Sequence, residues 1–350
     1  ANAALEPFAA ADILMPAGKR TLSQWMKFAN SLRLRLAIRV SMSAPDLARA
    51  EVAKAMDATA GGVLESADET VAVSTESGYK NPLGTVNEGW GEVFMGATME
   101  SVLVGYNDPR LIKYYSKAEG GDIKDEKGNL IIAERNKIAG TYKGVPQGTG
   151  VTVKDENRYR LHSKSTITKQ TDAILMTAAE VWFLRAEAAL RGFTSENVKD
   201  CYEKGITVSC QQWGVNVGDY LTSDATPSDY VDAFEAKYDV KALIKVTPKW
   251  DGGASPEEQL ERILTQKWIA CYPEGYEAWT EQRRTGYPQL FKVFVNNSGG
   301  AIDTDIRIRR LPYPSDIQKN NPTQYSALKK ALGGEDNGGT RLWWDTGRNF

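Results

Sequence analysis

The clearest pattern of apolar and polar positions predicts two antiparallel helices over residues 177–213. The segment TAAEVWFLRAEAALRG places four apolar residues near one helical stripe, namely Val181, Leu184, Ala188 and Leu190. Gly192 is positioned to end this helix. Ser195 is then positioned to cap a second helix, SENVKDCYEKGITVSCQQWG, which runs to Trp213. Because the first helix is rich in alanine, we expect the second to pack closely against it.

Residues 21–59 predict a second pair of helices. The segment TLSQWMKFANSLRLRLAIRVSM places six residues on one helical face, namely Trp25, Phe28, Ala29, Leu32, Leu36 and Val40. Pro45 suits the first position of the next helix, DLARAEVAKAMDAT. We interpret Arg33, Arg35 and Arg39 as a solvated or ion-paired face rather than an anion site. Two such hairpins are typical of tetratricopeptide-type scaffolds, which serve recognition more often than catalysis.

The rest of the chain is less regular. Residues 61–176 are rich in Gly, Ser, Asn and Thr, and they predict a short strand at TVAVS, a helix at GEVFMGATMESVLVGY and a hairpin over residues 122–150. Helices return at residues 255–272 and 275–286, with Ser255 as the cap of the first, and the tail reads mostly as loop. No linker separates these parts. We therefore predict one mainly α domain over residues 1–350, with tetratricopeptide-like helical hairpins packed against long irregular loops and a few short strands.

Composition narrows the possible functions. The net charge is −2, so nothing predicts a basic surface for nucleic acid. His162 is the one histidine, which argues against a His-based zinc site or a Ser-His-Asp triad, and we expect it at the surface in the polar stretch YRLHSKST. Cys201 and Cys210 lie about 13 Å apart along one predicted helix, too far for a disulfide, so we expect buried free thiols.

The ends and hydropathy of the chain bear on its location. No run of eighteen apolar residues is present, so we expect no membrane-spanning helix. The chain opens with ANAALEPFAAADILMPAGK, without an initiating methionine or a signal peptide. We interpret it as a fragment, or as a chain whose export signal has been removed.

Aromatic residues in loops are the strongest candidates for ligand contact. Sugar rings stack on flat aromatic faces while amide and charged groups bind their hydroxyls. The chain has nine Trp and fifteen Tyr. Tyr79 and Trp90 form the best pair because Asn81 and Asn87, with Glu88, supply polar partners beside them, and Tyr142 and Trp250 are further candidates. For each of these aromatics the alternative is local packing. The helical tryptophans are expected in the core, namely Trp25, Trp182, Trp213 and Trp268.

Catalytic and metal-binding patterns are weaker. A glycoside hydrolase needs two carboxylates across a cleft, but Glu180 and Glu187 flank Arg185 on one predicted helix, which favours structural pairing. The acidic loops GGEDNGG and DEKGN lack the ordered ladder of an EF-hand, and KGVPQGTGV lacks the ending of a phosphate loop. We predict no catalytic residue, no metal and no cofactor.

Three segments, in this order, resemble the SusD/RagB family of outer-membrane nutrient-binding lipoproteins of Bacteroidetes. AAEVWFLRAEAALRG is similar to the family helix with an Arg-Ala-Glu core, and ILTQKWIACYPEGYEAWTEQRRTGYP to its paired helices around Glu-Gly and Arg-Arg-Thr-Gly. RIRRLPYPSDIQKNNP resembles its Arg-x-Pro-x-Pro segment, with Tyr313 between the two prolines. YNDPRL and the terminal LWWD fit the SusD-like branch. The main matches cover the C-terminal half, and weaker ones extend back to about residue 21.

The resemblance implies a function. It predicts non-enzymatic, cell-surface binding of oligosaccharide nutrients for delivery to a SusC-like TonB-dependent transporter, at the extracellular face of the outer membrane. Attachment would be only through a lipid anchor outside this chain. On the family pattern roughly the first third is absent, so ligand residues there cannot be named. The hairpins would serve structure or docking and residues 61–100 recognition. The alternatives are a RagB-like protein that binds peptides and a tetratricopeptide adaptor for other proteins.

Overall fold

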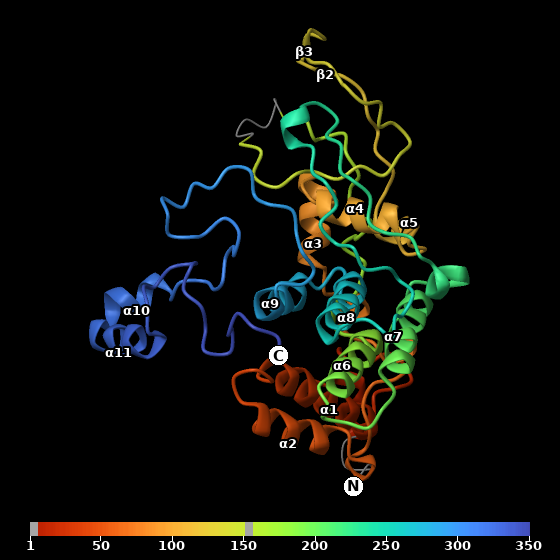
Figure 1. The fold of residues 1–350 in the computed structure, drawn as a ribbon, viewed down its shortest axis with the longest axis vertical. Coiled ribbons are helices and arrows are strands. Elements are labelled where there is room, and N and C mark those ends of the chain that lie inside the picture. The colour runs from red at the N-terminus through yellow and green to blue at the C-terminus, as the bar shows by residue number, and fades with distance from the viewer. Residues whose placement is uncertain (1–5, 151–156) are drawn as a thin grey trace.

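The computed structural model describes residues 6–150 and 157–350 and is mainly α-helical, as predicted (Figure 1). The longer helices are α1 (Leu22–Arg39), α2 (Pro45–Ala55), α6 (Ala178–Leu190), α7 (Val198–Gln212), α8 (Pro256–Ala270) and α9 (Gly275–Thr285). The remaining helices are α3 (Pro82–Thr85), α4 (Ala97–Gly105), α5 (Leu111–Tyr114), α10 (Ser315–Asn320) and α11 (Pro322–Leu332). The strands are β1 (Val71–Val73), β2 (Ile123–Lys124), β3 (Leu130–Ile132) and β4 (Ala173–Met176).

Both predicted hairpins form, and together with α8 they build the core (Figure 1). Thr177 caps α6 by accepting a hydrogen bond from the backbone N–H of Glu180. Asn197, and not Ser195 as expected, caps α7. Gly205 of α7 lies against the Phe183 ring so closely that a Cβ would come within 2.8 Å of it. This glycine, in addition to the alanines of α6, therefore permits the close packing of the two helices.

The buried face of α1 differs from the predicted one. Leu34, Ala37 and Ile38 are buried, whereas Leu36 is 50% exposed and Trp25 37% exposed. The helix carries apolar residues on more than one side, so periodicity alone did not identify the core-facing side. The buried side also holds small polar groups, and Ser31 accepts a hydrogen bond from the backbone N–H of Leu64 at 2.9 Å.

The strands are short, and the two sheets are separate antiparallel pairs. β1, which was predicted, pairs with β4, which was not, with Val71 opposite Met176 and Val73 opposite Ala173. β2 and β3 form the predicted hairpin, which projects at the top of Figure 1. The helix expected over residues 91–106 begins only at Ala97, because the preceding backbone forms bridges to distant segments.

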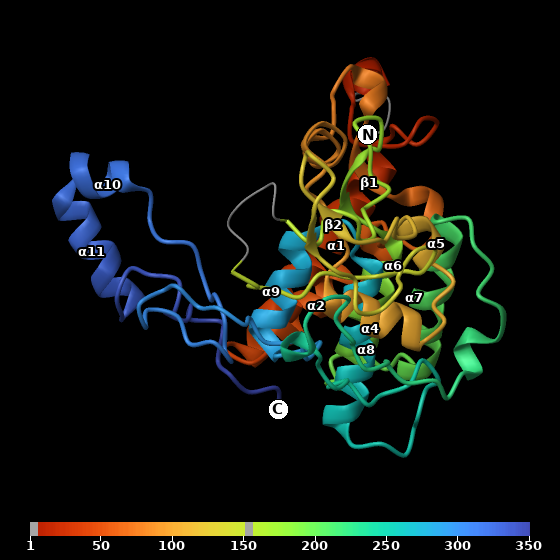
Figure 2. The same ribbon diagram turned by 90° about the horizontal axis from the view of Figure 1, so that it is seen from above.

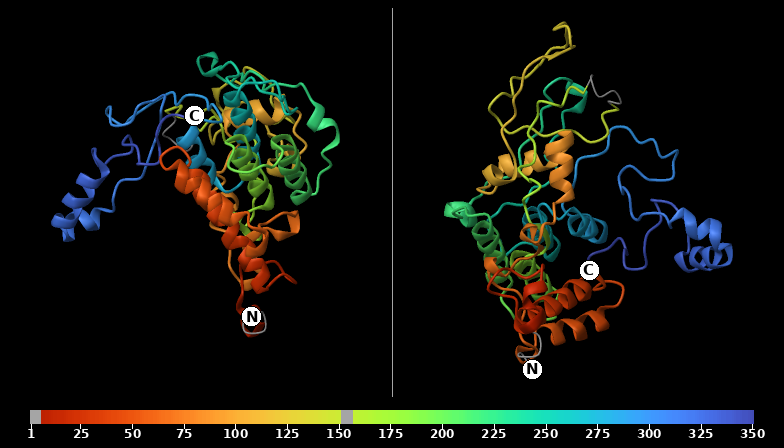
Figure 3. Two further views of the ribbon diagram at one scale, coloured as in Figure 1. Left: turned by 60° about the horizontal axis from the view of Figure 1, so that its bottom comes forward. Right: turned by 180° about the vertical axis from the view of Figure 1, so that it is seen from behind.

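The tail contains two helices that the sequence analysis assigned to loop. Asn321 caps α11 by accepting a hydrogen bond from the backbone N–H of Gln324, Pro322 occupies the first turn, and Gly333 ends the helix at a φ of +73°. We call α10 and α11 the C-terminal arm. Neither helix has a buried residue, and both lie away from the main body (Figures 1, 2 and 3).

Candidate functional site

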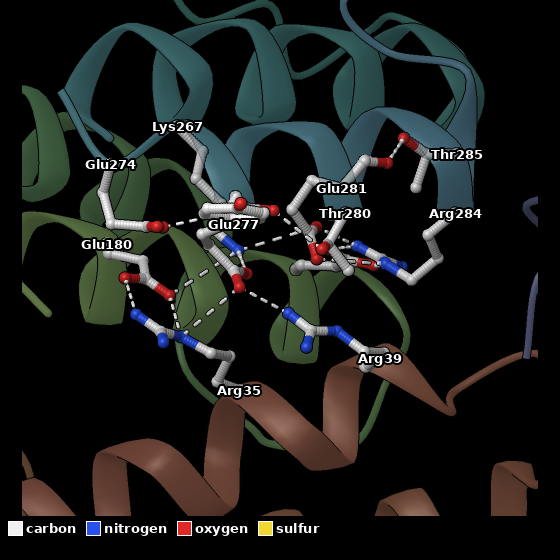
Figure 4. A network of polar contacts seen from close by, with 12 residues as sticks. Arg35, Arg39, Glu180, Lys267, Glu274, Glu277, Thr280, Glu281, Arg284 and Thr285 are labelled. Atoms are coloured by element: carbon white, nitrogen blue, oxygen red, sulfur yellow. Dashed lines mark hydrogen bonds and ion pairs between the residues drawn. The ribbon is translucent and has the colours of Figure 1, made fainter. Parts of the chain in front are cut away.

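Buried charges join α1, α6, α8 and α9 into one network (Figure 4). The Lys267 ammonium, with its side chain 1% exposed, lies 3.3 Å from a carboxylate oxygen of Glu277, 3.5 Å from one of Glu281 and 3.9 Å from one of Glu180. One ammonium group thus lies close to three carboxylates. Because each partner is buried and paired, this arrangement binds helices together rather than exposing a reactive group.

Arginines complete the network. Arg284 donates to both carboxylate oxygens of Glu187 at 2.7 Å, and Arg35 of α1 donates to Glu180 at 2.7 Å. Burial alone would raise the pKa of Glu187, but the charges of Arg284 and Arg191 outweigh it and lower that pKa. Ion pairing was predicted for Arg35 and for Glu180 and Glu187.

The predicted partner of these two glutamates was wrong. Arg185 pairs instead with Glu65 at 2.8 Å and with Glu196. Glu180 meets Arg35 of α1 and Glu187 meets Arg284 of α9, which spacing along α6 does not reveal. Glu187 also pairs with Arg191, four residues further along, at 2.8 Å.

Other charged residues of the recognised segments also form buried ion pairs within the protein. Asp108 and Arg110 of YNDPRL are fully buried and paired at 2.6 Å. Arg309 of RIRRLPYP pairs with Asp345 of LWWD at 2.7 Å. These charged residues of the recognised segments therefore hold the scaffold together.

The segment from Tyr79 to Gly91 is anchored by the polar residues proposed for ligand contact. The Asn81 side chain accepts from the backbone N–H of Leu83 and donates to the Thr171 carbonyl oxygen, both at 3.0 Å. The Asn87 amide donates to the carbonyl oxygens of Ser165 and Ile167 at 2.7 and 2.8 Å, and Glu88 accepts from the backbone N–H of Lys169 at 2.7 Å. These side chains tie the segment to residues 165–171.

Trp90 stands at the end of this anchored segment. It closes a π-helical turn, Val86–Trp90, and Gly91 follows at a φ of +65°. The Trp90 side chain is 63% exposed, while Tyr79 is half-buried. The Lys164 ammonium lies 4.0 Å from the position that a Cβ on Gly91 would occupy, so a charged donor sits beside the segment. The result is an exposed indole face on a fixed backbone.

A family model described as "SusD-like: Susd and RagB outer membrane lipoprotein" matches residues 10–345. The chain belongs to this SusD-like family. A SusD homologue from Bacteroides vulgatus is 50% identical with a TM-score of 0.85, and the match covers 99% of this chain and 69% of that one. A chitin-binding SusD homologue from Flavobacterium johnsoniae is 36% identical with a TM-score of 0.86, covering 98% and 67%. No curated protein matches.

The other two candidate residues of this SusD-like protein lie in different surroundings. Tyr142 packs against the main core and lines a depression of about 860 Å³ together with Ile112 and Asn216. The Trp250 ring packs 5.1 Å from that of Tyr202, at the edge of the core. The structure thus places Tyr79, Asn81, Asn87 and Trp90 on one segment, and Tyr142 and Trp250 apart from it.

Sequence reasoning missed a cavity of about 610 Å³ between α9 and residues 290–308. Trp268 packs against the main core, as expected, and it also lines this cavity together with Trp279. Trp182 and Trp213 pack against the core as expected, but Trp25 is largely at the surface. The signal that could have located the cavity is the helical spacing of Gly275, Ala278, Trp279 and Gln282, which share one face of α9.

His162 is buried, contrary to expectation. Its ring is 2% exposed and packs 5.1 Å from Tyr159 and 5.9 Å from Phe234. Burial, with a smaller contribution from the Lys143 charge, lowers the pKa of His162 to about 3. Tyr159 belongs to this polar stretch itself, whereas Phe234 lies far along the chain, so local composition did not reveal the contact with Phe234.

The remaining observations concern thiols and the membrane. Cys201, Cys210 and Cys271 are buried free thiols, as expected. Across residues 6–150 and 157–350, the helices are too short or too polar to cross a bilayer. The family is one of outer-membrane lipoproteins.

Proposed function

We propose that this SusD-like protein is a non-enzymatic binding protein that captures an oligosaccharide on the face presented by Trp90. The observation that supports this most is the 63% exposure of the Trp90 side chain on a backbone held by Asn81, Asn87 and Glu88. Large aromatic side chains usually pack when they can, so a fixed and exposed indole is a suitable platform for a sugar ring.

The anchoring makes the platform effective. Binding is weakened when a loop must be ordered at the moment of contact, and each immobilised side chain costs about 0.5–1.5 kcal/mol. The amides of Asn81 and Asn87 order this segment in advance. The Lys164 ammonium, beside Gly91, is positioned to donate hydrogen bonds to sugar hydroxyls.

The distribution of carboxylates supports a role without catalysis. Glycoside hydrolysis requires two carboxylates on opposite sides of the scissile bond. The buried glutamates Glu180, Glu187, Glu277 and Glu281 instead face lysine and arginine within the protein. These glutamates therefore stabilise the packing of the helices.

We infer that the bound oligosaccharide passes to a SusC-like TonB-dependent transporter at the extracellular face of the outer membrane. A transporter gains from a partner that holds ligand at high local concentration above its channel. The ligand class follows from the aromatic platform, and the chitin-binding relative makes chitin oligosaccharides the first to test.

Isothermal titration of the purified chain against chitin oligosaccharides, α-glucans, β-glucans and a peptide library tests this proposal. We expect binding to at least one glycan and to no peptide. Binding to peptides alone would favour a RagB-like function. Recovery of soluble protein partners in a pull-down, without a membrane transporter, would favour the adaptor.

A further inference from the structure

The cavity between α9 and residues 290–308 is built from the face of α9 opposite the ion-pair network. Four residues at helical spacing line it, namely Gly275, Ala278, Trp279 and Gln282. The residues that α9 directs into the network are Glu277, Glu281 and Arg284. Figure 4 shows the network that fixes one face of the helix. The opposite face lines the cavity.

The outer wall of the cavity is tied to the body. Arg307 donates to the carbonyl oxygen of Leu290 at 2.8 Å and to the Gln147 side chain at 3.2 Å. Trp279 donates from its indole N–H to the Ile308 carbonyl oxygen at 3.0 Å. Arg307 has a φ of +63°, a left-handed conformation that is costly for a residue with a side chain and is held here by its hydrogen bonds. The cavity is therefore formed before any ligand arrives.

The lining combines aromatic surface with neutral hydrogen-bonding groups. Trp268 and Trp279 provide indoles, and Arg283 stacks 3.6 Å from the Trp279 ring centroid. Leucine, valine and isoleucine side chains from residues 290–308 supply further apolar surface. Asp303, an acidic residue in the lining, accepts hydrogen bonds from the backbone N–H groups of residues 305 and 306.

Gln282 is a polar side chain of α9 that lines the cavity. It is 8% exposed, and its side-chain amide makes no hydrogen bond with the described residues. The amide is accessible at the cavity surface, where it can donate and accept hydrogen bonds. This amide marks a position for a ligand group that both accepts and donates hydrogen bonds.

We propose that this cavity is a second ligand site, separate from the Trp90 platform, for the end of a neutral glycan that carries an apolar substituent. The glycan part of this assignment rests on the proposed function. A volume of about 610 Å³ lies within the range of small-molecule sites and suits about two sugar-sized rings. The indoles and aliphatic side chains take the apolar substituent, and Gln282 bonds a hydroxyl or amide of the sugar.

The test is isothermal titration with p-nitrophenyl N-acetyl-β-glucosaminide, which joins a neutral sugar to an apolar ring. Ala278→Phe places a ring in the cavity, and Ala327→Phe makes the same change on the exposed face of α11 as a matched control. We expect Ala278→Phe to weaken binding at least tenfold, with Ala327→Phe unchanged. Thermal melts establish that each variant is folded.

Gln282→Met is the second variant, because it keeps the side-chain length and removes the amide. We expect binding to weaken about threefold to tenfold, the effect of one lost hydrogen bond to a neutral group. If Ala278→Phe does not fold, titration of Gln282→Met with the same probe tests the cavity site by itself. Loss of probe binding in Trp90→Ala but not in the cavity variants, or no probe binding by the wild type, overturns the proposal. Probe binding without any polysaccharide binding would leave the cavity site standing while the proposed function fails.

Discussion

At the scale of single residues, Trp90 differs from the two asparagines beside it in exposure. Trp90 is exposed, whereas Asn81 is buried and Asn87 is half-buried. Residue types identified Tyr79, Asn81, Asn87 and Trp90 as a group, and the structure keeps them on one segment. The direction of each side chain was not predictable, because Asn81 and Asn87 bond to backbone from residues 165–171, far along the chain. The burial of His162 was not predictable for the same reason, because the ring of Phe234, far along the chain, packs against it.

Leu184→Asp should unfold the domain. The Leu184 side chain is fully buried in the main core, and placing a carboxylate there costs about 3 kcal/mol or more. Leu36→Asp is the matched control, because Leu36 is 50% exposed and the change there should be within about 0.5 kcal/mol. Urea unfolding followed by circular dichroism measures both. Equal stability of the two variants would contradict the placement of α6 in the core.

His162 should stay neutral throughout the mildly acidic range. Its pKa is lowered to about 3, so the folded state favours the uncharged ring, and stability associated with this residue is lost as pH falls from about 6.5 toward 3. Since the chain has one histidine, its Hε1 proton gives a single NMR signal. We expect no titration of that signal between pH 8 and pH 4.5. A midpoint near 6.5 would show that the ring is solvated.

At the scale of elements, periodicity predicted the hairpins because an apolar stripe and its end signals are local properties. The capping box at Ser255, with Pro256 and Glu258, also formed as predicted. The core-facing side of α1 was not predictable, since its arginines turn toward carboxylates of α6 and α9. Ion-pair partners depend on which helices meet, and no spacing along one helix contains that information.

Glu187→Gln should destabilise the protein by about 3–5 kcal/mol at pH 7, because it removes the buried carboxylate that pairs with both Arg284 and Arg191. The folded pKa of Glu187 is lowered, so its contribution is present above about pH 4.5 and is lost as pH falls below that value. The difference between wild type and variant should therefore shrink at pH 3 in urea titrations.

Glu203→Gln provides the control for this network. Glu203 pairs with Lys199 at 2.8 Å on the outer face of α7, and the Lys199 side chain is 51% exposed. Such a pair contributes about 0.5 kcal/mol or less. If Glu187→Gln cost no more than Glu203→Gln, the network would not stabilise the junction of the helices.

At the scale of the whole molecule, the order of the recognised segments predicted the family and the mainly α fold. Charged residues of those segments form buried ion pairs in the packed body, and the third segment continues into α10 of the C-terminal arm. The C-terminal arm was missed although Asn321, Pro322 and Gly333 are ordinary start and stop signals and Tyr325, Leu328 and Leu332 recur at helical spacing. The α9 cavity was missed because its outer wall is irregular chain.

Replacing residues 315–332 with a Gly-Ser linker should change the stability of the body by less than about 1 kcal/mol, since neither helix of the C-terminal arm has a buried residue. Differential scanning calorimetry of the two proteins measures this. Loss of the cooperative transition would mean that the arm is part of the folding unit.

The central claim is that Trp90 presents a sugar-binding face on an anchored segment, and titration of wild type and Trp90→Ala with the best-binding glycan tests it most directly. Trp343→Ala is the matched control, because Trp343 is 68% exposed in the tail. We expect Trp90→Ala to leave the thermal melt unchanged and weaken binding by about 1–2 kcal/mol, with Trp343→Ala unaffected. A Trp90→Ala protein that melts early, or that binds glycan as tightly as the wild type, would contradict the account.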